Sequence, residues 1–390
     1  MMTVDTPLAQ RLGRIITSVI LCLLFIVIIA INILPFFDGK NDLMDFGSFY
    51  ASGLKLQAGQ NPYDPNSEYI FDISFAQVGA GGKMINLNPP ISAIIFQFIS
   101  KFEPHQAMTA WQILSAVLYL IVVWILITAY KSNVRPGIVI WALTLAGLWH
   151  TLVLGQIYIL LLFFTALGWV FLQREKYILA GIAIGLLIAI KPNFIIWPLF
   201  LLISGYSLTF ALSIISSLIT SLIPIVFFGT KIYTQWLEAS VLRPETLRMP
   251  GNNSLLGLTA RFHSVGLGIA ISILLVLALL ALSRFKSPSN MGRLEYLSAL
   301  GIIASLLASP ISWTGYTILL LPIYFSLKKW TWPVIVSAAI LSIPFAIVLQ
   351  LFQNSFLNFV ILGWLYGWGI LLLLGDIVRN TIMTKSIQTS

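Results

Sequence analysis

Residues 106–130 read QAMTAWQILSAVLYLIVVWILITAY, an unbroken apolar run of 25 residues without a charged side chain. A helix needs about 20 such residues to cross the hydrocarbon core of a bilayer. The run does not alternate between apolar and polar positions, as a strand of a membrane barrel does, so it favours a helix. Runs of 14 to 25 apolar residues recur along nearly the whole chain. The sequence therefore predicts an all-α polytopic membrane protein.

The composition excludes a soluble globular protein, because 58% of the residues are hydrophobic and only 9% are charged. The net charge of +9 comes from single or paired basic residues at helix ends. That pattern is the orientation signal of a membrane protein, so no nucleic-acid partner is expected. Cys22 is the only cysteine, and the three histidines are far apart in sequence. We expect no disulfide, no metal site and no nucleotide-binding loop.

The apolar runs predict twelve spans in one domain, 1–390, with both termini inside. The spans are expected at 14–36, 106–130, 136–150, 154–172, 177–191, 192–205, 207–229, 264–284, 294–309, 311–327, 331–351 and 357–376. The short loops placed inside carry most of the basic residues. Two long polar intervals, 37–88 and 230–262, then lie outside. The first run has no small-residue cleavage site, so we interpret it as an uncleaved anchor.

Two places leave the number of spans open between ten and fourteen. Pro89-Pro90 begins an apolar segment that is too short for a crossing and is expected to be a half-helix or a re-entrant segment. Lys191-Pro192 interrupts a stretch of 29 residues, which is either two helices or one kinked helix.

The first outer interval, 37–88, holds six of the thirteen acidic residues in the chain. Within it, residues 46–58 have the pattern of a short amphipathic helix that lies in the plane of the interface. Gly59-Gln60-Asn61-Pro62 is a turn signal that ends this helix. Chemistry at a membrane face is therefore expected to involve this interval.

Asp45 is a candidate general base, because a carboxylate at a membrane-facing cleft can accept the proton of an acceptor hydroxyl. The alternatives are a solvated loop acid and an N-cap for the helix that follows. By position alone, Asp38 and Asp42 are nearly equivalent candidates.

Basic residues in two other places are candidate phosphate ligands. Lys191 is flanked by apolar residues, so it is either a partner for an anionic group or a lysine that snorkels to the interface. The second outer interval contains Arg243, Arg248 and Arg261, which are either bidentate phosphate ligands or part of a solvated basic loop. Gly155-Gln156 and Trp313 mark outer turns.

These features follow one another in a recognisable order over residues 40–325. They are Asp45-Phe46…Tyr50, Gly59-Gln60-Asn61-Pro62-Tyr63, Pro89-Pro90, Leu154-Gly155-Gln156, Gly181…Gly185…Ile190-Lys191, Asn253-Ser254…Arg261 and Ser309-Pro310-Ile311-Ser312-Trp313. The order resembles glycosyltransferase family 87, the mannosyltransferase-like group of the GT-C superfamily, whose members use polyprenyl-phosphate sugars.

The resemblance implies a GT-C-like bundle and an inverting hexosyltransferase of the plasma membrane. It would move a hexose, mannose first among the candidates, from a polyprenyl-phosphate donor to an extracytoplasmic glycolipid or glycan. With Lys and Arg available for a monophosphate leaving group, the chemistry requires no metal or other cofactor, and one displacement with one base predicts inversion. The resemblance implies that Asp45 is the catalytic base and that Lys191 and Arg261 bind the donor phosphate. Further substrate-binding positions implied by the matching motifs are Tyr50, Asn61, Tyr63, Gln156, Asn253 and Trp313.

The chain departs from the family pattern in two places. Family members often have Asn where this chain has Tyr158, and acidic and His residues where it has Thr314-Gly315-Tyr316. The main rival is a secondary transporter or a flippase for lipid-linked sugars, which should carry acids within its spans. No acid lies between Glu175 and Glu238, which favours the enzyme. A non-catalytic scaffold is the third hypothesis.

Overall fold

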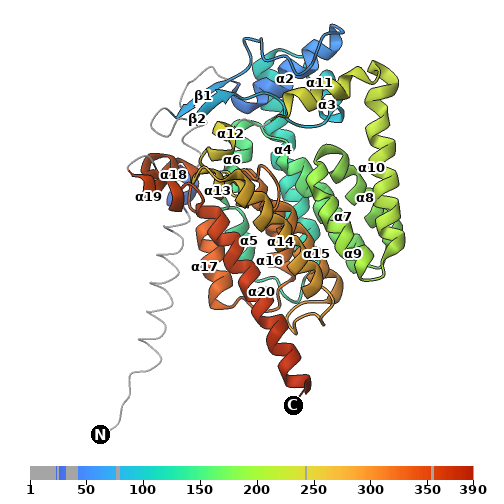
Figure 1. Cartoon of the computed structure of the whole chain (residues 1–390), viewed down its shortest axis with the longest axis vertical. Helices are drawn as coiled ribbons and strands as arrows, with labels where there is room; N and C mark the ends of the chain where they lie inside the picture. The colour runs from blue at the N-terminus through green and yellow to red at the C-terminus, as the bar shows by residue number, and fades with distance from the viewer. Residues whose placement is uncertain are drawn as a thin grey trace.

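The computed structural model describes residues 23, 26–31, 43–75, 80–241, 244–352 and 355–389. Helices form nearly all of its secondary structure, in a bundle with a layer of short elements across one end (Figure 1). The end layer contains α2 (Met44–Gln57), β1 (Asp72–Phe75), β2 (Ala80–Lys83), α3 (Pro90–Ile99), α11 (Lys231–Ala239), α12 (Pro244–Arg248) and α13 (Leu255–Ala260).

The bundle begins with α4 (Pro104–Ala129), α5 (Pro136–Ala142), α6 (Ala146–Leu154), α7 (Tyr158–Gln173), α8 (Tyr177–Ile190), the 3-10 helix η3 (Pro192–Ile195), α9 (Ile196–Ile203) and α10 (Ser207–Phe228). It continues with α14 (Val265–Leu282), α15 (Arg293–Leu307), η4 (Thr314–Leu320), α16 (Leu321–Ser326), α17 (Trp332–Leu341), α18 (Phe345–Leu351), α19 (Phe356–Ile361) and α20 (Leu365–Thr389). Helix α15 is central, since every residue from Tyr296 to Leu307 is buried.

The polytopic, all-helical architecture is confirmed, whereas the number of twelve spans is not. Among the described residues, four stretches are long and apolar enough to cross a membrane: α4, α5 with α6, α10 and α14. A fifth appears if α17 and α18, which meet at 80°, count as one span. The other apolar helices are shorter, and most of the expected span 14–36 lies outside the described residues.

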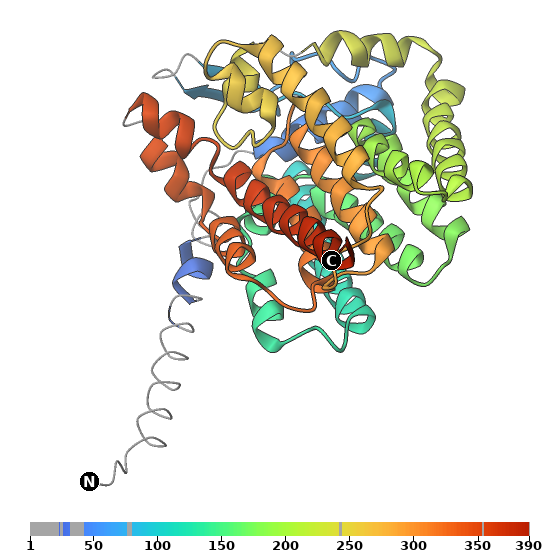
Figure 2. The ribbon, with the colours of Figure 1, turned by 60° about the horizontal axis from the view of Figure 1, so that its bottom comes forward.

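The outward faces of the long helices are apolar. Leu218 and Val226 of α10 are 59% and 77% exposed, and Leu274 of α14 is 64% exposed. Helix α10 lies at the edge of the bundle in two views (Figures 1 and 2). Apolar surface of this extent is stable in contact with lipid and not in water.

Two expected helices are divided at identifiable residues. Lys191 has φ −141° and ψ 93°, which ends α8 before Pro192 opens η3, so the 29-residue stretch forms separate helices. The expected span 357–376 is wrong in its bounds, because α19 ends at Ile361 and α20 begins at Leu365. Between the two helices, the Gly363 carbonyl accepts hydrogen bonds from Gly251 N and Arg261 Nη2. These bonds replace the intrahelical hydrogen bond that this carbonyl would accept in a continuous helix.

The helix expected at residues 46–58 is confirmed as α2, but its side chains are more buried than an interfacial amphipathic helix requires. Ser48 and Ser52, expected on a polar outer face, are 4% and 2% exposed. The reason is that α3 covers α2: the Phe49 and Phe96 rings stack 4.7 Å apart. The short segment after Pro89 is therefore a half-length helix that packs on α2.

A two-stranded hairpin, β1 with β2, was not expected from the sequence. The strands are antiparallel, with Asp72 opposite Lys83 and Phe75 opposite Ala80. The second strand reads Ala80-Gly81-Gly82-Lys83, and glycines are depleted in strands, so propensity gives no signal for it.

The turns predicted to lie inside are connected to one another at the end of the bundle away from α2. Asn133 Nδ2 donates to the Ser326 carbonyl at 3.1 Å, and Lys328 N donates to the Asn290 carbonyl at 3.2 Å. Arg293 Nη2 donates to Ser204 Oγ at 3.3 Å. Their basic residues therefore gather on one side of the molecule, as the expected orientation requires.

Candidate active site

Asp45 is buried in the first turn of α2, with only 5% of its surface exposed. Met44, directly before it, has a φ of 48°, a left-handed conformation that is uncommon for a residue with a side chain. Backbone strain of this kind is concentrated at functional sites. Ser48 Oγ donates to the Asp45 carbonyl at 2.8 Å, which supports the turn.

The Gly155-Gln156 turn brings the end of α6 against α2. Gly155 has a φ of 64° and follows the last turn of α6, a position that favours glycine. A Cβ at this position would lie 2.7 Å from the Phe46 Cβ, so the close approach also requires glycine. This contact allows Gln156 Nε2 to donate a hydrogen bond to the Asp45 carboxylate.

Burial raises the pKa of Asp45 from 3.8 to about 6. The ionised form is the one that loses most by leaving water, so burial favours the neutral acid. The hydrogen bond from Gln156 opposes this effect, because it stabilises the carboxylate. Asp45 is therefore mostly ionised at neutral pH, but it is a stronger base than an exposed aspartate.

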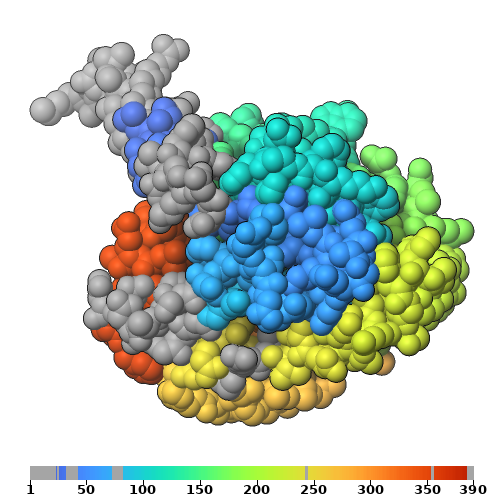
Figure 3. Space-filling model, turned by 90° about the horizontal axis from the view of Figure 1, so that it is seen from above, coloured from blue at the N-terminus to red at the C-terminus, as the bar shows by residue number. Residues whose placement is uncertain are grey.

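Asp45 faces a cavity of about 490 Å³, within the usual size of a small-molecule site. Most of the lining is apolar and comes from the outer layer, α6, the start of η4 and α18. The residues are Ile31, Asp45, Phe71, Asp72, Met84, Trp149, His150, Val153, Leu154, Met249, Pro250, Gly251, Trp313, Thr314, Phe345, Ala346 and Leu349. Seen from above, residues of the first outer interval occupy the middle of this face (Figure 3).

Of the expected substrate-binding residues, Trp313 lines the cavity. Tyr50, Asn61 and Tyr63 do not line it, and their hydrogen bonds hold the first outer interval in place. The Tyr50 hydroxyl donates to the Phe102 carbonyl at 2.8 Å. The Tyr63 hydroxyl donates to the Asn88 carbonyl at 3.0 Å, and Asn61 Oδ1 accepts from Tyr63 N at 3.0 Å.

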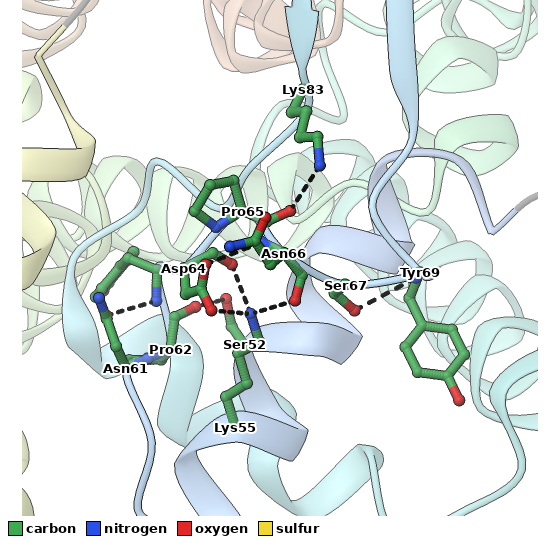
Figure 4. A network of polar contacts seen from close by, with 11 residues as sticks. Ser52, Lys55, Asn61, Pro62, Asp64, Pro65, Asn66, Ser67, Tyr69 and Lys83 are labelled. Carbon is green, nitrogen blue, oxygen red and sulfur yellow. Dashed lines mark hydrogen bonds and ion pairs between the residues drawn. The ribbon is translucent and has the colours of Figure 1, made fainter.

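A polar network fixes this loop on α2 (Figure 4). Lys55 Nζ lies 3.2 Å from the Asp64 carboxylate and donates to the carbonyls of Asp64 and Asn66. Ser52 Oγ donates to the Pro62 carbonyl at 2.7 Å. The Asn61-Pro62-Tyr63 motif thus holds the helix that carries Asp45, and its effect on the cavity is indirect.

Lys191 lies apart from the cavity lining, at the extended break between α8 and η3. Its Nζ lies 5.6 Å from the centre of the Tyr316 ring, and that ring lies 4.3 Å from the Tyr158 ring. The Tyr158 and Tyr316 rings therefore pack beside Lys191, which forms no hydrogen bond or ion pair with the Asp45 carboxylate among the described residues. Neither of the ion pairs found among the described residues involves Lys191.

Arg261 is 1% exposed and lies behind the cavity wall. Its Nη2 donates to the carbonyls of Met249 and Gly363, both at 2.9 Å, and to that of Asn252 at 3.3 Å. Its Nε and Nη1 have no hydrogen-bond partner among the described residues. Arg261 thereby ties the segment with Met249, which lines the cavity, to the start of α20.

The motif Asn252-Asn253-Ser254 contributes mainly through Asn252. Asn252 Oδ1 accepts from Ser254 N and Ser312 N at 3.2 and 2.9 Å, which joins the second outer interval to the turn before Trp313. Asn253 is fully buried and donates from Nδ2 to the Gly251 carbonyl at 2.8 Å. Asn253 therefore supports the wall and does not line the cavity.

Three polar residues that line the cavity, Asp72, His150 and Thr314, were not selected from the sequence. In the sequence, His150 is far from the other histidines, which indicates no metal site and gives no signal for a cavity position. Thr314 stands where the family pattern was not matched. Within the described residues, no three His, Cys, Asp or Glu side chains are grouped to hold a metal ion.

The arrangement favours a transferase over a non-catalytic scaffold. A buried carboxylate that faces a cavity, on a short helix outside the bundle, is the geometry expected of a catalytic base at a membrane face. A scaffold would have left Asp45 in solvent or lipid. Asp38, Asp42 and Arg243 lie outside the described residues.

A comparison with protein families points to a transferase as well. A sequence profile described as "Glycosyltransferase family 87" matches residues 86–310. The crystal structure of ArnT from Cupriavidus metallidurans, bound to undecaprenyl phosphate, is similar with a TM-score of 0.40 and 13% sequence identity. That match covers 92% of this chain and 77% of that chain. A search of curated protein sequences finds no significant match.

Proposed function

Since the chain belongs to glycosyltransferase family 87, we propose that it is a hexosyltransferase that uses a polyprenyl-phosphate sugar as donor and inverts the anomeric centre. Mannose is the first candidate for the sugar, and the acceptor is a glycolipid or glycan on the extracytoplasmic face of the plasma membrane. The observation that carries the proposal is the buried Asp45 carboxylate, which Gln156 orients on the wall of the 490 Å³ cavity.

The proposed reaction is a single displacement. Asp45 takes the proton of the acceptor hydroxyl while the hydroxyl oxygen forms a bond to the anomeric carbon. The bond from that carbon to the phosphate oxygen breaks, and the electron pair leaves with polyprenyl phosphate. Asp45 then returns the proton to water. One displacement from the opposite face inverts the configuration, and the chemistry requires no cofactor.

The leaving phosphate needs a cation, and Lys191 is the better of the two expected ligands. Its ammonium has no ion-pair partner among the described residues and lies over the Tyr316 ring, 5.6 Å from the ring centre. Arg261 is held by three carbonyls, so we assign it first to the cavity wall. Lys191→Gln is expected to weaken donor binding without lowering thermal stability, whereas Arg261→Lys should lower stability.

The test is turnover by the purified protein in detergent or nanodiscs with polyprenyl-phosphate-mannose, -glucose or -arabinose, in the presence of a membrane glycolipid extract that supplies the acceptor hydroxyl. We expect sugar-dependent release of polyprenyl phosphate with one of these donors. Asp45→Asn should abolish release, whereas the matched change Glu68→Gln, at an exposed acid of the same interval, should preserve it. No release from any donor, or full release by Asp45→Asn, would contradict the proposal.

A further inference from the structure

Two residues that line the cavity each carry a side-chain polar atom with no hydrogen-bond partner within the described part of the chain. The atoms are His150 Nδ1 and Thr314 Oγ1, and both are inaccessible to solvent. Both residues line the cavity that Asp45 faces. The large majority of buried side-chain polar atoms in native proteins are hydrogen-bonded, so two unpaired side-chain atoms at one cavity point to a ligand that pairs them.

The two atoms belong to one patch of the wall. The His150 ring meets the Phe345 ring edge-on, with centroids 4.8 Å apart. A Cβ built on Gly251 would lie 2.8 Å from Phe345 Cε2 and 2.9 Å from Thr314 Oγ1. The chain of contacts from His150 through Phe345 and Gly251 to Thr314 therefore places both polar atoms around the same part of the cavity.

The chemistry of this patch fits a neutral, hydroxyl-bearing ring. A threonine hydroxyl both donates and accepts, and a neutral imidazole offers one donor and one acceptor. Trp149, Trp313 and Phe345 add aromatic surface beside them, against which the C–H face of a sugar can pack. No Lys or Arg is among the described residues of the lining, so the patch does not suit a phosphate.

The position of the patch favours the donor sugar over the acceptor. His150 and Thr314 belong to α6 and η4 of the bundle, whereas Asp45 comes from the outer layer. A donor with a lipid tail reaches the cavity from the bundle side, and its acceptor must approach the base. We propose that His150 and Thr314 form the subsite that binds the ring hydroxyls of the donor's glycosyl group; this rests on the proposed function.

Binding measurements test the subsite without turnover. The affinity of the purified full chain for each of the three polyprenyl-phosphate sugars is compared with its affinity for sugar-free polyprenyl phosphate. The ratio isolates the contribution of the sugar. Thr314→Val removes the hydroxyl at constant shape, His150→Phe removes the ring nitrogens, and His150→Asn restores a polar atom near Nδ1. Thr151→Val is the matched control, because among the described residues Thr151 Oγ1 donates to the Gly147 carbonyl of its own helix and Thr151 does not line the cavity.

We expect the wild type to bind one sugar-bearing lipid more tightly than the sugar-free lipid. Thr314→Val and His150→Phe should each reduce that ratio about tenfold, the value of one lost buried hydrogen bond. The affinity for the sugar-free lipid should stay constant, His150→Asn should recover part of the ratio, and Thr151→Val should leave it unchanged.

Two results would overturn the subsite: no sugar-dependent gain in wild-type affinity, or an unchanged ratio in both Thr314→Val and His150→Phe. Failure of the proposed function gives another combination of results in the binding and turnover assays. In that case the sugar-dependent binding and its sensitivity to the two substitutions remain, but no polyprenyl phosphate is released in the turnover assay.

Discussion

The carboxyl group of Asp45 is under two opposing influences, and their balance decides when the residue can act as a base. Burial raises its pKa to about 6, and the hydrogen bond from Gln156 limits the rise. Since only the carboxylate accepts a proton, activity should fall as the pH drops through about 6. A plot of kcat/KM against pH between 4.5 and 8 measures this, and a flat profile would contradict the assignment of the base.

The raised pKa of Asp45 also affects the folding stability of the protein. A carboxyl whose folded-state pKa is above its ordinary value of 3.8 binds a proton more tightly in the folded protein than in the unfolded protein. The free energy of unfolding therefore falls as the pH rises from 3.8 to about 6, because the buried group must then ionise. Asp45→Asn is therefore expected to lose transfer activity while its apparent melting temperature at pH 7 stays equal or rises. Lower stability of this variant would instead indicate a structural carboxylate.

Gln156 should tune the base rather than take part in proton transfer. Gln156→Leu removes a hydrogen bond that lowers the pKa of Asp45, so the acidic limb of the pH profile should move to higher pH. Gln112→Leu is a matched control, because Gln112 Nε2 donates to the Leu152 carbonyl and not to Asp45. Equal profiles for wild type and Gln156→Leu would show that the hydrogen bond has no influence on catalysis.

Individual site residues were only partly predictable from the sequence. Position alone did not separate Asp45 from Asp38 and Asp42, and the family resemblance made the choice. The pairing with Gln156 joins residues 111 positions apart, which no local pattern can reveal. His150 gave no signal for the same reason, since its ring packs on Phe345, which is far away in the sequence. The charge of Arg261 made it a candidate in the sequence, but only the structure shows its hydrogen bonds to three backbone carbonyls.

At the scale of elements, the contact between α6 and α2 depends on one glycine. Gly155 and Gly59 have nearly the same φ, 64° and 67°, but only Gly155 has a neighbour within 4 Å. Both alanine variants carry the cost of a left-handed residue, about 1 kcal/mol. Gly155→Ala should cost a further ~1–3 kcal/mol from contact with Phe46, and it should reduce activity.

Thermal unfolding and transfer activity are measured for Gly155→Ala and Gly59→Ala. Their difference separates the cost of the contact with Phe46 from the cost of the left-handed backbone conformation. Equal stability of the two variants would mean that α6 moves away from α2 without penalty.

Elements with strong apolar signals were predicted well, and those set by tertiary contacts were not. The bounds of α4, α8 and α10 lie within about two residues of the expected spans. Pro192 marked the break after α8 because proline lacks the backbone donor. The break before α20 has no such marker, since it depends on Gly363 bonding to Gly251 and Arg261. The β1–β2 hairpin depends on backbone pairing between the two strands, and the glycine-rich composition of β2 does not predict a strand.

For the molecule as a whole, the orientation in the membrane is open to a direct test. In a Cys22→Ser background, Asn66→Cys lies in the outer interval and Ser132→Cys lies in an exposed turn at the other end of the bundle. A membrane-impermeant maleimide should label residue 66 in intact cells and residue 132 only after permeabilisation. The reverse pattern would place the cavity on the cytoplasmic side.

The sharp bend between α17 and α18 has a consequence for how the protein is made. It turns α18 across the cavity, where Phe345, Ala346 and Leu349 complete the lining that begins with residues of the first outer interval. During synthesis, these two parts of the wall leave the ribosome roughly 300 residues apart, or at least 15 s at usual elongation rates. The nascent chain thus carries its base well before a closed cavity exists, and a chain that ends before α18 lacks part of the cavity wall.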